Sequence, residues 1–492
     1  MKKQLPKNWV ETELGNYAML KNGYAFKSND FQTEGLPVVK ISNIKDFKIE
    51  IENSICVDES KLKPDFIIAK GDILIAMSGA TTGKYGVFEQ DVIALQNQRV
   101  GNLKPVVESL SNRRFLLYLL GSLKEEIEEK AYGAAQPNIS PKLIESINIF
   151  LPPLAEQNRI VEKLDRLFAQ LEIIKSSMVK VPELLKDFRQ QVLTQAVTGK
   201  LTEEWRKGKK LEIVDVNTEL NSNYFLHSIP EKWKHSVVGN IGKVKGGKRL
   251  PKGHELVTEN TGLPYIRARD LKKGTVLTDK LMFLKPETQI QIKNYIVNKG
   301  DLYITIVGAK IGDAGVVPAK MHAANLTENA AKITDLNEFV FNEYISIWLR
   351  GTICQSNIQE TIMSAAQGKL ALTRISQLPI YLPPLQEQQE IVSRVESLFA
   401  RADAIEQQYK TLKTSIDTLP QALLHKAFKG ELTEQLDSDG DAKELLEEIK
   451  ALKDATGKVI KSKTNKRATK KVKPYSETEE VMGMVAEEQY KK

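Results

Sequence analysis

A glycine-rich segment carries the residue types that most suggest chemistry. From Gly79 to Lys84, two glycines, two threonines and a lysine stand in nearly the order of a phosphate-binding P-loop, but the spacing is one residue short and Tyr85 follows the lysine. The related segment from Gly308 to Asp313 has lost the lysine at the matching point. The pattern therefore argues against a nucleoside triphosphate site.

Other catalytic motifs are equally incomplete. Asp270-Leu271-Lys272 has the form of half a nuclease site, but it lacks a suitable acidic partner upstream. The Pro-Pro pairs lie between leucines, so the Asn-Pro-Pro-aromatic motif of an adenine methyltransferase is missing, and no Gly-x-Gly-x-x-Gly is present. The five histidines show no metal-binding spacing. We expect a non-catalytic chain that binds no metal and no cofactor.

An internal repeat organises the chain. Pro6 recurs as Pro230, Gly71-Asp72 as Gly300-Asp301, and Leu151-Pro152-Pro153-Leu154 as Leu382-Pro383-Pro384-Leu385. The separation drifts from 224 to 231 residues along the repeat, so the matches keep one order. Such ordered self-similarity indicates a tandem duplication of a unit of about 200 residues.

Each repeat begins with a mixed α/β part, at about 5–150 and 229–381. The apolar runs 71–77 and 300–306 predict strands that end in glycine-rich loops. More helical stretches follow, around 112–130 and 338–359. Trp9 and Trp233 are expected to pack in cores or between domains.

A long helix follows each Leu-Pro-Pro-Leu junction. Apolar residues recur every seven positions, as a coiled coil requires. Two matched seams favour packing of the helices on each other; packing of each on its own globular part is the alternative. Pro182 and Pro420 are expected to kink or break these helices, and Gly199 and Gly430 suit their C-termini. The seams are Leu164, Leu171, Met178, Leu185, Val192 with Ile160, Leu167, Ile174, Val181, Phe188, and Val395, Ala402, Tyr409, Ile416, Leu423 with Ile391, Leu398, Ile405, Leu412, Leu419.

Composition limits the class of protein. The chain has 492 residues, 41% hydrophobic, with two cysteines, which fits a reducing compartment. The formal net charge is +8, but residues 458–473 hold eight basic residues and no acidic one, so the rest is close to neutral. With no apolar run long enough for a bilayer and no apparent secretory signal, we expect a cytoplasmic protein that does not associate with membranes. Residues 442–454 predict a short helix, and the charged remainder predicts disorder.

The duplicated plan resembles the specificity subunits of type I restriction–modification systems. The resemblance rests on the Gly-Asp-Ile-Leu run at 71–74, the loop 78–83, and the junctions that continue as Ala155-Glu156-Gln157 and Gln386-Glu387-Gln388. It implies an α+β chain with two target-recognition domains that read the halves of a bipartite double-stranded DNA site. Two long helices would form an antiparallel coiled-coil spacer between them.

The resemblance also implies partners. Two modification subunits would bind S-adenosylmethionine and methylate adenine, and two restriction subunits would use ATP and Mg to translocate and cleave DNA. The expected domains are 1–152 and 216–383 for recognition, 153–215 and 384–436 for the spacer helices, and 437–492 for the tail. A helix of about 44 residues spans about 65 Å, ample to separate two half-sites by one turn of DNA.

Candidate DNA contacts are of two kinds. Small hydroxyls, backbone N–H groups and lysines of the glycine-rich loops suit phosphates, and long polar side chains that differ between the copies suit base edges. Gln136 and Gln367, in a shared loop, would help to position the protein on the DNA rather than read its sequence. The candidates are Ser78, Thr81, Thr82, Lys84, Tyr85, Gln96, Asn97, Gln98, Arg99, Lys245, Lys248, Arg249, Arg267, Arg269 and Lys310.

Two other functions stay open at this point. A stand-alone DNA-binding or scaffold protein would lack a surface for enzyme subunits. A complete methyltransferase-nuclease in one chain would need the adenine-binding motif that the sequence lacks.

Overall fold

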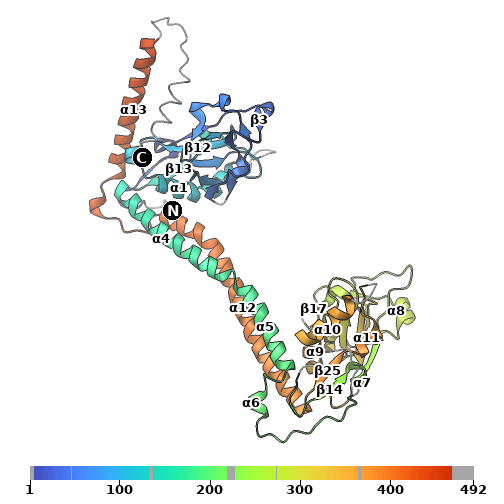
Figure 1. Cartoon of the computed structure of the whole chain (residues 1–492). Helices are drawn as coiled ribbons and strands as arrows, with labels where there is room; N and C mark the ends of the chain where they lie inside the picture. Colours follow the sequence, from blue (N-terminus) through green and yellow to red (C-terminus); the bar gives the residue numbers. More distant parts are fainter. Residues whose placement is uncertain are drawn as a thin grey trace. The chain divides into compact units, whose positions relative to one another are not determined.

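The computed structural model describes residues 5–45, 47–131, 137–218, 228–272, 274–363 and 368–467. The chain divides into two compact units, Met1–Lys175 with Thr414–Lys492, and Ser176–Lys413. Each unit contains the globular part of one repeat together with segments of the long helices (Figure 1).

The first unit is built on two mixed sheets. One has the strand order β2-β12-β9-β10-β6-β5 and the other β3-β7-β4-β11-β8, while β1 pairs with β13 separately. All four residues of the central strand β9 are buried, because it has a neighbour on each side and packs on both faces. The strands are β1 Val10–Glu13, β2 Ala18–Asn22, β3 Phe31–Gln32, β4 Leu36–Val39, β5 Ile44–Lys45, β6 Phe47–Ile49, β7 Cys56–Val57, β8 Ile67–Ile68, β9 Ile73–Ala76, β10 Tyr85–Val87, β11 Ala94–Gln96, β12 Val100–Pro105 and β13 Asn148–Leu151.

The second unit repeats this plan with shorter sheets. Its sheets run β15-β24-β21-β22 and β19-β16-β23-β20, with the separate pairs β14–β25 and β17–β18. The central strand β21 again has every residue buried. The strands are β14 Lys234–Val237, β15 Lys243–Gly246, β16 Pro264–Ile266, β17 Leu271–Lys272, β18 Thr275–Val276, β19 Met282–Phe283, β20 Ile296–Val297, β21 Leu302–Thr305, β22 Ala314–Val316, β23 Ala324–Leu326, β24 Ala330–Thr334 and β25 Pro379–Leu382.

Short helices cover these sheets where the sequence predicted helical stretches. Helices α1 and α2 lie in the first unit, and α9 and α10 in the second. Their apolar faces join the main cores, which hold Phe115 and Leu119 in one unit and Tyr344 and Trp348 in the other. The helices are α1 Arg113–Ser122, α2 Lys124–Ala131, α3 Pro141–Glu145, α7 Val238–Ile241, α8 Pro286–Ile292, α9 Asn342–Arg350, α10 Thr352–Met363 and α11 Leu372–Ser376.

The long helices are α4 Leu154–Met178, α5 Val181–Val197 and α12 Leu385–Ala427. They pack together as predicted and run antiparallel. In the first unit the beginning of α4 and the end of α12 share a core, which includes Leu164 and Leu424. In the second unit the end of α5 shares a core with the beginning of α12, through Val197 and Ile391.

The two prolines act differently. Pro182 lies in the first turn of α5, directly after the break between α4 and α5, where a missing backbone N–H costs no helical hydrogen bond. Pro420 lies inside α12, which continues to Ala427, so of the two expected effects, a kink or a break, the break does not occur there. The expected C-termini are confirmed: Gly199 and Gly430 follow α5 and α12 with φ of 77° and 73°.

A buried glutamate joins each globular part to a helix end of the other repeat. In the first unit Glu156 accepts hydrogen bonds from the Trp9 indole (2.8 Å) and from Thr433 and Gln435, which follow α12. We call this set the clasp. It confirms that Trp9 packs inside.

The second unit has the equivalent clasp. Glu387 accepts from the Trp233 indole (3.0 Å) and from Thr202 (2.7 Å), which follows α5, and it also pairs with Arg206 of α6 (Glu203–Arg206). The Leu-Thr-Glu motif after each long helix therefore binds the repeat from which it does not come.

The tail begins as a helix, as predicted, but the helix is longer than expected. Helix α13, Ala442–Arg467, starts where Ala442 donates its backbone N–H to Asn8 O (Figure 1). Leu446 and Ile449 bury its first turns in the first core. Among the residues that the structure describes, no helix has the length and apolar character of a membrane span.

Candidate nucleic-acid interface

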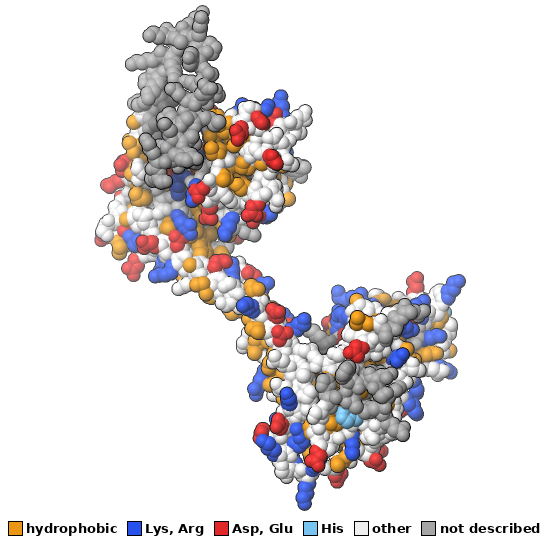
Figure 2. Space-filling model, viewed as in Figure 1, with side chains coloured by type: hydrophobic (Ala, Val, Ile, Leu, Met, Phe, Trp, Pro, Cys, Tyr) orange, Lys and Arg blue, Asp and Glu red, His pale blue; other side chains and the backbone are white. Residues whose placement is uncertain are grey.

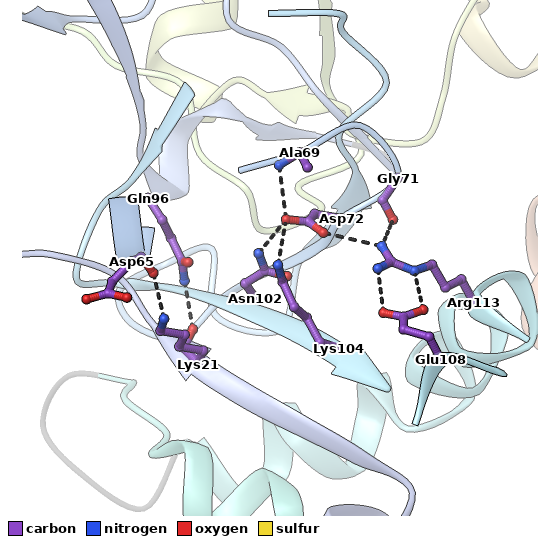
Figure 3. Close-up of polar contacts among 10 residues, drawn as sticks. All are labelled: Lys21, Asp65, Ala69, Gly71, Asp72, Gln96, Asn102, Lys104, Glu108 and Arg113. Carbon is purple, nitrogen blue, oxygen red and sulfur yellow. Dashed lines mark hydrogen bonds and ion pairs between the residues drawn. The ribbon is translucent and has the colours of Figure 1, made fainter. Parts of the chain in front are cut away.

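An aspartate fixes the start of each central strand. Asp72 accepts hydrogen bonds from the Ala69 backbone (3.1 Å) and the Asn102 amide (2.8 Å), and it forms ion pairs with Lys104 and Arg113 at 3.3 Å each (Figure 3). Because this carboxylate is 1% exposed and needs these partners, the turn before β9 has one geometry. The loop after β9 is placed by that strand.

The second unit keeps the same device with other side chains. Asp301 accepts from the Asn298 backbone (2.9 Å) and lies 3.8 Å from the Lys332 ammonium. Asn342 donates to Gly300 O, as Arg113 does to Gly71 O. The repeated Gly-Asp motif, Gly71-Asp72 and Gly300-Asp301, is therefore structural.

The first glycine-rich loop joins β9 to β10 and turns most of its candidate residues inward. Thr82 is buried and donates to Gly79 O at 2.7 Å. The hydroxyls of Ser78 and Thr81 are buried and have no hydrogen-bond partner among the described residues. Lys84 is exposed. This loop therefore offers one charged side chain and two unsatisfied hydroxyls.

Tyr85 lies in the core of the first unit. It is 5% exposed, and its ring packs edge-on against Phe47 at 5.1 Å. Burial raises the pKa of its hydroxyl well above the usual value. Its position gives it a packing role.

The first two residues of the run 96–99 face the interior, and the last two face the surface. Gln96 is 1% exposed, and its amide donates to Lys21 O at 2.7 Å (Figure 3). It also donates to Val100 O at 2.7 Å. Asn97 is buried, and its side chain accepts from the Arg99 backbone. Gln98 and Arg99 are exposed. These last two side chains are the ones available to a ligand.

An aromatic–cation cluster that sequence reasoning missed lies beside them. Tyr24 donates its backbone N–H to Gln96 O (2.8 Å), and its ring lies 5.5 Å from the Phe66 ring. The Lys63 ammonium lies 5.3 Å from the Tyr24 ring centroid, and the Lys21 ammonium 5.5 Å from that of Phe66. We call Tyr24, Phe66, Gln98 and Arg99 the first readout surface.

The second unit presents different side chains at the same place. Lys248 donates its backbone N–H to Leu326 O (2.8 Å) and lies over the Tyr295 ring at 5.5 Å. Arg249 pairs with Glu328 at 2.9 Å. We call Lys248, Arg249, Tyr295 and Glu328 the second readout surface.

A glycine precedes each readout surface in the sequence and marks its position. A Cβ at Gly23 would lie 2.3 Å from Asn97 O, and one at Gly247 would lie 2.0 Å from Thr327 O. Each glycine thus lets two loops touch. The pair recurs at the repeat separation of 224 residues, a signal that could have placed Tyr24 beside 96–99 from the sequence alone.

Comparison with known proteins decides the family. The family model described as the type I restriction modification DNA specificity domain matches residues 6–182 and 230–414. The type I restriction enzyme EcoBI specificity subunit of Escherichia coli is 31% identical over 469 residues, which cover 92% of this chain and 93% of that protein. The chain belongs to the family of type I restriction–modification specificity subunits.

Solved structures agree on the fold. This specificity subunit is similar to the HsdS subunit from Thermoanaerobacter tengcongensis, with a TM-score of 0.59 and 18% identity over 87% of this chain and 99% of that one. A chain from a study of complex assembly and conformational transition in the type I R-M system gives a TM-score of 0.61 at 18% identity, again covering 87% and 99%. The predicted fold, two mixed α/β domains with long packed helices, is confirmed, and the family is non-catalytic.

The remaining candidate residues of the specificity subunit lie on the second unit. Lys245 is exposed and lies 3.7 Å from Asp335. Arg267 is held by Asp270 in a two-pronged contact of 2.8 Å each, which caps a turn and accounts for the nuclease-like Asp-Leu-Lys sequence. Arg269 and Lys310 are exposed. Gln136 and Gln367 lie outside the described residues.

Charge is spread over this surface. Figure 2 shows Lys and Arg side chains around the second globular part. Of the predicted candidates there, Lys245, Lys248, Arg249, Arg269 and Lys310 are exposed cations. Such side chains suit the phosphates and guanine edges of DNA.

Proposed function

We propose that this specificity subunit reads a bipartite double-stranded DNA target. The first recognition domain, 1–152, reads one half through the first readout surface, and the second domain, 216–383, reads the other through the second. The spacer helices, 153–215 and 384–436, set the separation of the halves, and 437–492 is an appended tail.

One observation carries the proposal. At the same place in two copies of one fold, the first domain exposes Gln98 and Arg99 beside an aromatic pair, and the second exposes Lys248 and Arg249 beside Glu328. Bases are told apart by hydrogen-bonding side chains in the major groove, so different side chains on one scaffold read different sequences. Lys84, Lys245, Arg269 and Lys310 then serve phosphates.

The long helices leave room for partner subunits. One of the two seven-residue series is largely buried, for example Leu164, Leu171 and Ile416, while members of the other are exposed. The exposed members are Ile174 at 45%, Phe188 at 38%, Ile405 at 50%, Leu412 at 51% and Leu419 at 41%. Exposed apolar side chains that recur at this spacing suit protein interfaces. We assign these side chains to contacts with two modification subunits.

In the complete assembly the chemistry belongs to the partners. The modification subunits bind S-adenosylmethionine and methylate adenine. Two restriction subunits bind ATP and Mg and cleave the DNA. The described residues include no group of three or more His, Cys, Asp or Glu arranged to hold a metal.

Methylome sequencing of a host with and without this gene tests the proposal. We expect adenine methylation at a motif with two specified halves and an unspecified gap, lost when the gene is removed. Purified chain alone should transfer no methyl group from S-adenosylmethionine, and a methyltransferase should co-purify with it. A chain that binds DNA without such a partner would favour the stand-alone binding protein instead.

A further inference from the structure

A cleft in the second unit is lined by two basic side chains that have no ion-pair or hydrogen-bonding partner in the described part of the fold. It has a volume of about 330 Å³ and is lined by Gln190, Lys310, Ile311, Gly312, Asp313, Arg350 and Gln355. It lies between the second glycine-rich loop, helix α5 and the start of α10. The side chains of Lys310 and Arg350 form no hydrogen bond or ion pair with any residue that the structure describes.

Arg350 is the unusual member. It ends α9, its guanidinium lies 5.8 Å from the Phe399 ring, and burial lowers its pKa. A Cβ at Gly274 would lie 2.4 Å from an Arg350 nitrogen, so that glycine makes room for it. A guanidinium carries five N–H donors, and leaving them unpaired in a half-buried site is costly. An anion in the cleft would satisfy them.

The walls of the cleft suit a phosphate. Asp313 is the acidic residue of the cleft lining. The positive charges of Lys310, Arg350 and Lys272 all interact with its carboxyl group, so basic groups outnumber the acidic one. The Gln355 amide donates to Gly312 O at 2.9 Å and fixes the loop that carries Lys310. Arg and Lys together give a bidentate donor and a point charge, the usual pair for phosphate oxygens.

The loop that carries Lys310 starts beside the second readout surface. Ile306, at the start of the glycine-rich loop, donates its N–H to Asn329 O at 2.8 Å, and Asn329 follows Glu328. One loop thus leads from the base-reading side chains to the cleft. A duplex whose edges are read at Glu328 therefore brings its backbone close to Lys310.

The first unit lacks the cleft cations. At the matching positions it has Gly121 for Arg350 and Thr81 for Lys310. The Tyr85 hydroxyl lies where a side chain at Gly121 would begin, 2.2 Å from an added Cβ. The feature belongs to one recognition domain alone.

We propose that Arg350 and Lys310 grip one backbone phosphate of the half-site that the second recognition domain reads. The inference rests on the proposed function and deepens it. It adds Arg350, a residue that neither the motif nor the repeat indicated, to the DNA interface. It also gives the second recognition domain a phosphate contact that the first domain lacks.

The test uses the complete chain with its modification subunits and a duplex carrying the methylated motif. We expect Lys310→Ala to weaken binding about tenfold and to lower the slope of log affinity against log salt by about one. Arg350→Gln should do the same, and the double variant should add little, because both hold one phosphate. Lys320→Ala, an exposed lysine of the same domain outside the cleft, is the control and should leave the slope unchanged.

Neutral methylphosphonate substitutions locate the phosphate. One position, in the second domain's half-site, should weaken wild-type binding but leave the Lys310→Ala complex unaffected. Equal effects of Lys310→Ala and Lys320→Ala, or no position that couples to Lys310, would overturn the inference while the bipartite reading stood. Failure of the wild-type complex to prefer any motif would refute the proposed function itself. Thermal unfolding identifies a misfolded Arg350→Gln, and Lys310→Ala, at an exposed site, then decides alone.

Discussion

At the scale of single residues, the candidate DNA contacts of each domain divide into buried and exposed side chains. Residues 98–99 and 248–249 lie at equivalent surfaces of the two domains. The sequence did not separate Gln96, which bonds inward, from Arg99, which is exposed. Residue type is the same for a buried and an exposed amide, and the burial depends on contacts with Lys21, 75 residues away.

The readout surfaces make a paired prediction. Arg99→Ala should relax the first half of the target and leave the second intact, whereas Lys248→Ala should do the reverse. Loss of one base contact costs about 1–3 kcal/mol at that position. Methylome sequencing of the two variants measures this, and each serves as the control for the other. Uniform loss across both halves would assign these side chains to general DNA affinity.

The clasps make a prediction about stability. Glu387→Gln removes the carboxylate that pairs with Arg206, whose side chain is 18% exposed, so we expect a loss of about 3 kcal/mol. Glu156 receives its hydrogen bonds from neutral groups, Trp9, Thr433 and Gln435, and Glu156→Gln should cost about 1 kcal/mol. Denaturant unfolding of both variants compares them. Equal losses would mean that the Arg206 ion pair adds nothing.

At the scale of elements, the seven-residue pattern predicted the long helices and their pairing but not which side would be covered. Half of the pattern, including Leu164 and Ala402, is buried, and much of the other half is exposed. A heptad pattern indicates that an apolar residue is to be buried, but it does not indicate which surface buries it. The helical run through Gly457 to Arg467 was also missed, because a glycine is a helix terminator by propensity alone.

The spacer makes a prediction about target geometry. An insertion near Thr194 would disturb the second domain, because Thr194 bonds Thr352 at 2.9 Å and Val197 lies in its core. Four residues are better added to both antiparallel helices, after Lys175 and after Lys413, where the chain divides into its units. That adds about 6 Å, so the unspecified gap should grow by one or two base pairs of about 3.4 Å. An unchanged methylation motif would argue against the spacer as a ruler.

At the scale of the whole molecule, the end of each spacer helix binds the globular part of the other repeat. Each Leu-Thr-Glu motif binds the glutamate of the opposite repeat, Thr202 at Glu387 and Thr433 at Glu156. The sequence displayed both motifs, but their exchange could not be predicted, because equal motifs fit either partner. Each repeat supplies one clasp glutamate and one threonine that binds the glutamate of the other repeat. In these contacts either repeat can therefore take the place of its partner.

Half of the chain should therefore rebuild the whole. A fragment of residues 1–215 contains Thr202 and Arg206, which bind a clasp glutamate, and Trp9 and Glu156, which form one. Two copies can exchange these groups in a two-fold dimer. With modification subunits, the dimer should methylate a palindrome made of the first half-site, as light scattering and methylome sequencing would reveal. A soluble monomer, or a target without palindromy, would contradict the equivalence of the repeats.

Independent reading of two half-sites is the central claim, and exchanging one domain tests it most directly. Residues 1–150 would be replaced by the matching part of a related specificity subunit, and the methylome of the host would be sequenced. The inserted segment must itself provide a strand pair equivalent to β1–β13 and a tryptophan that can donate to Glu156, because these contacts connect the domain to the spacer. We expect the first half of the motif to change, with the second half and the gap length retained. A change in both halves at once would contradict the account.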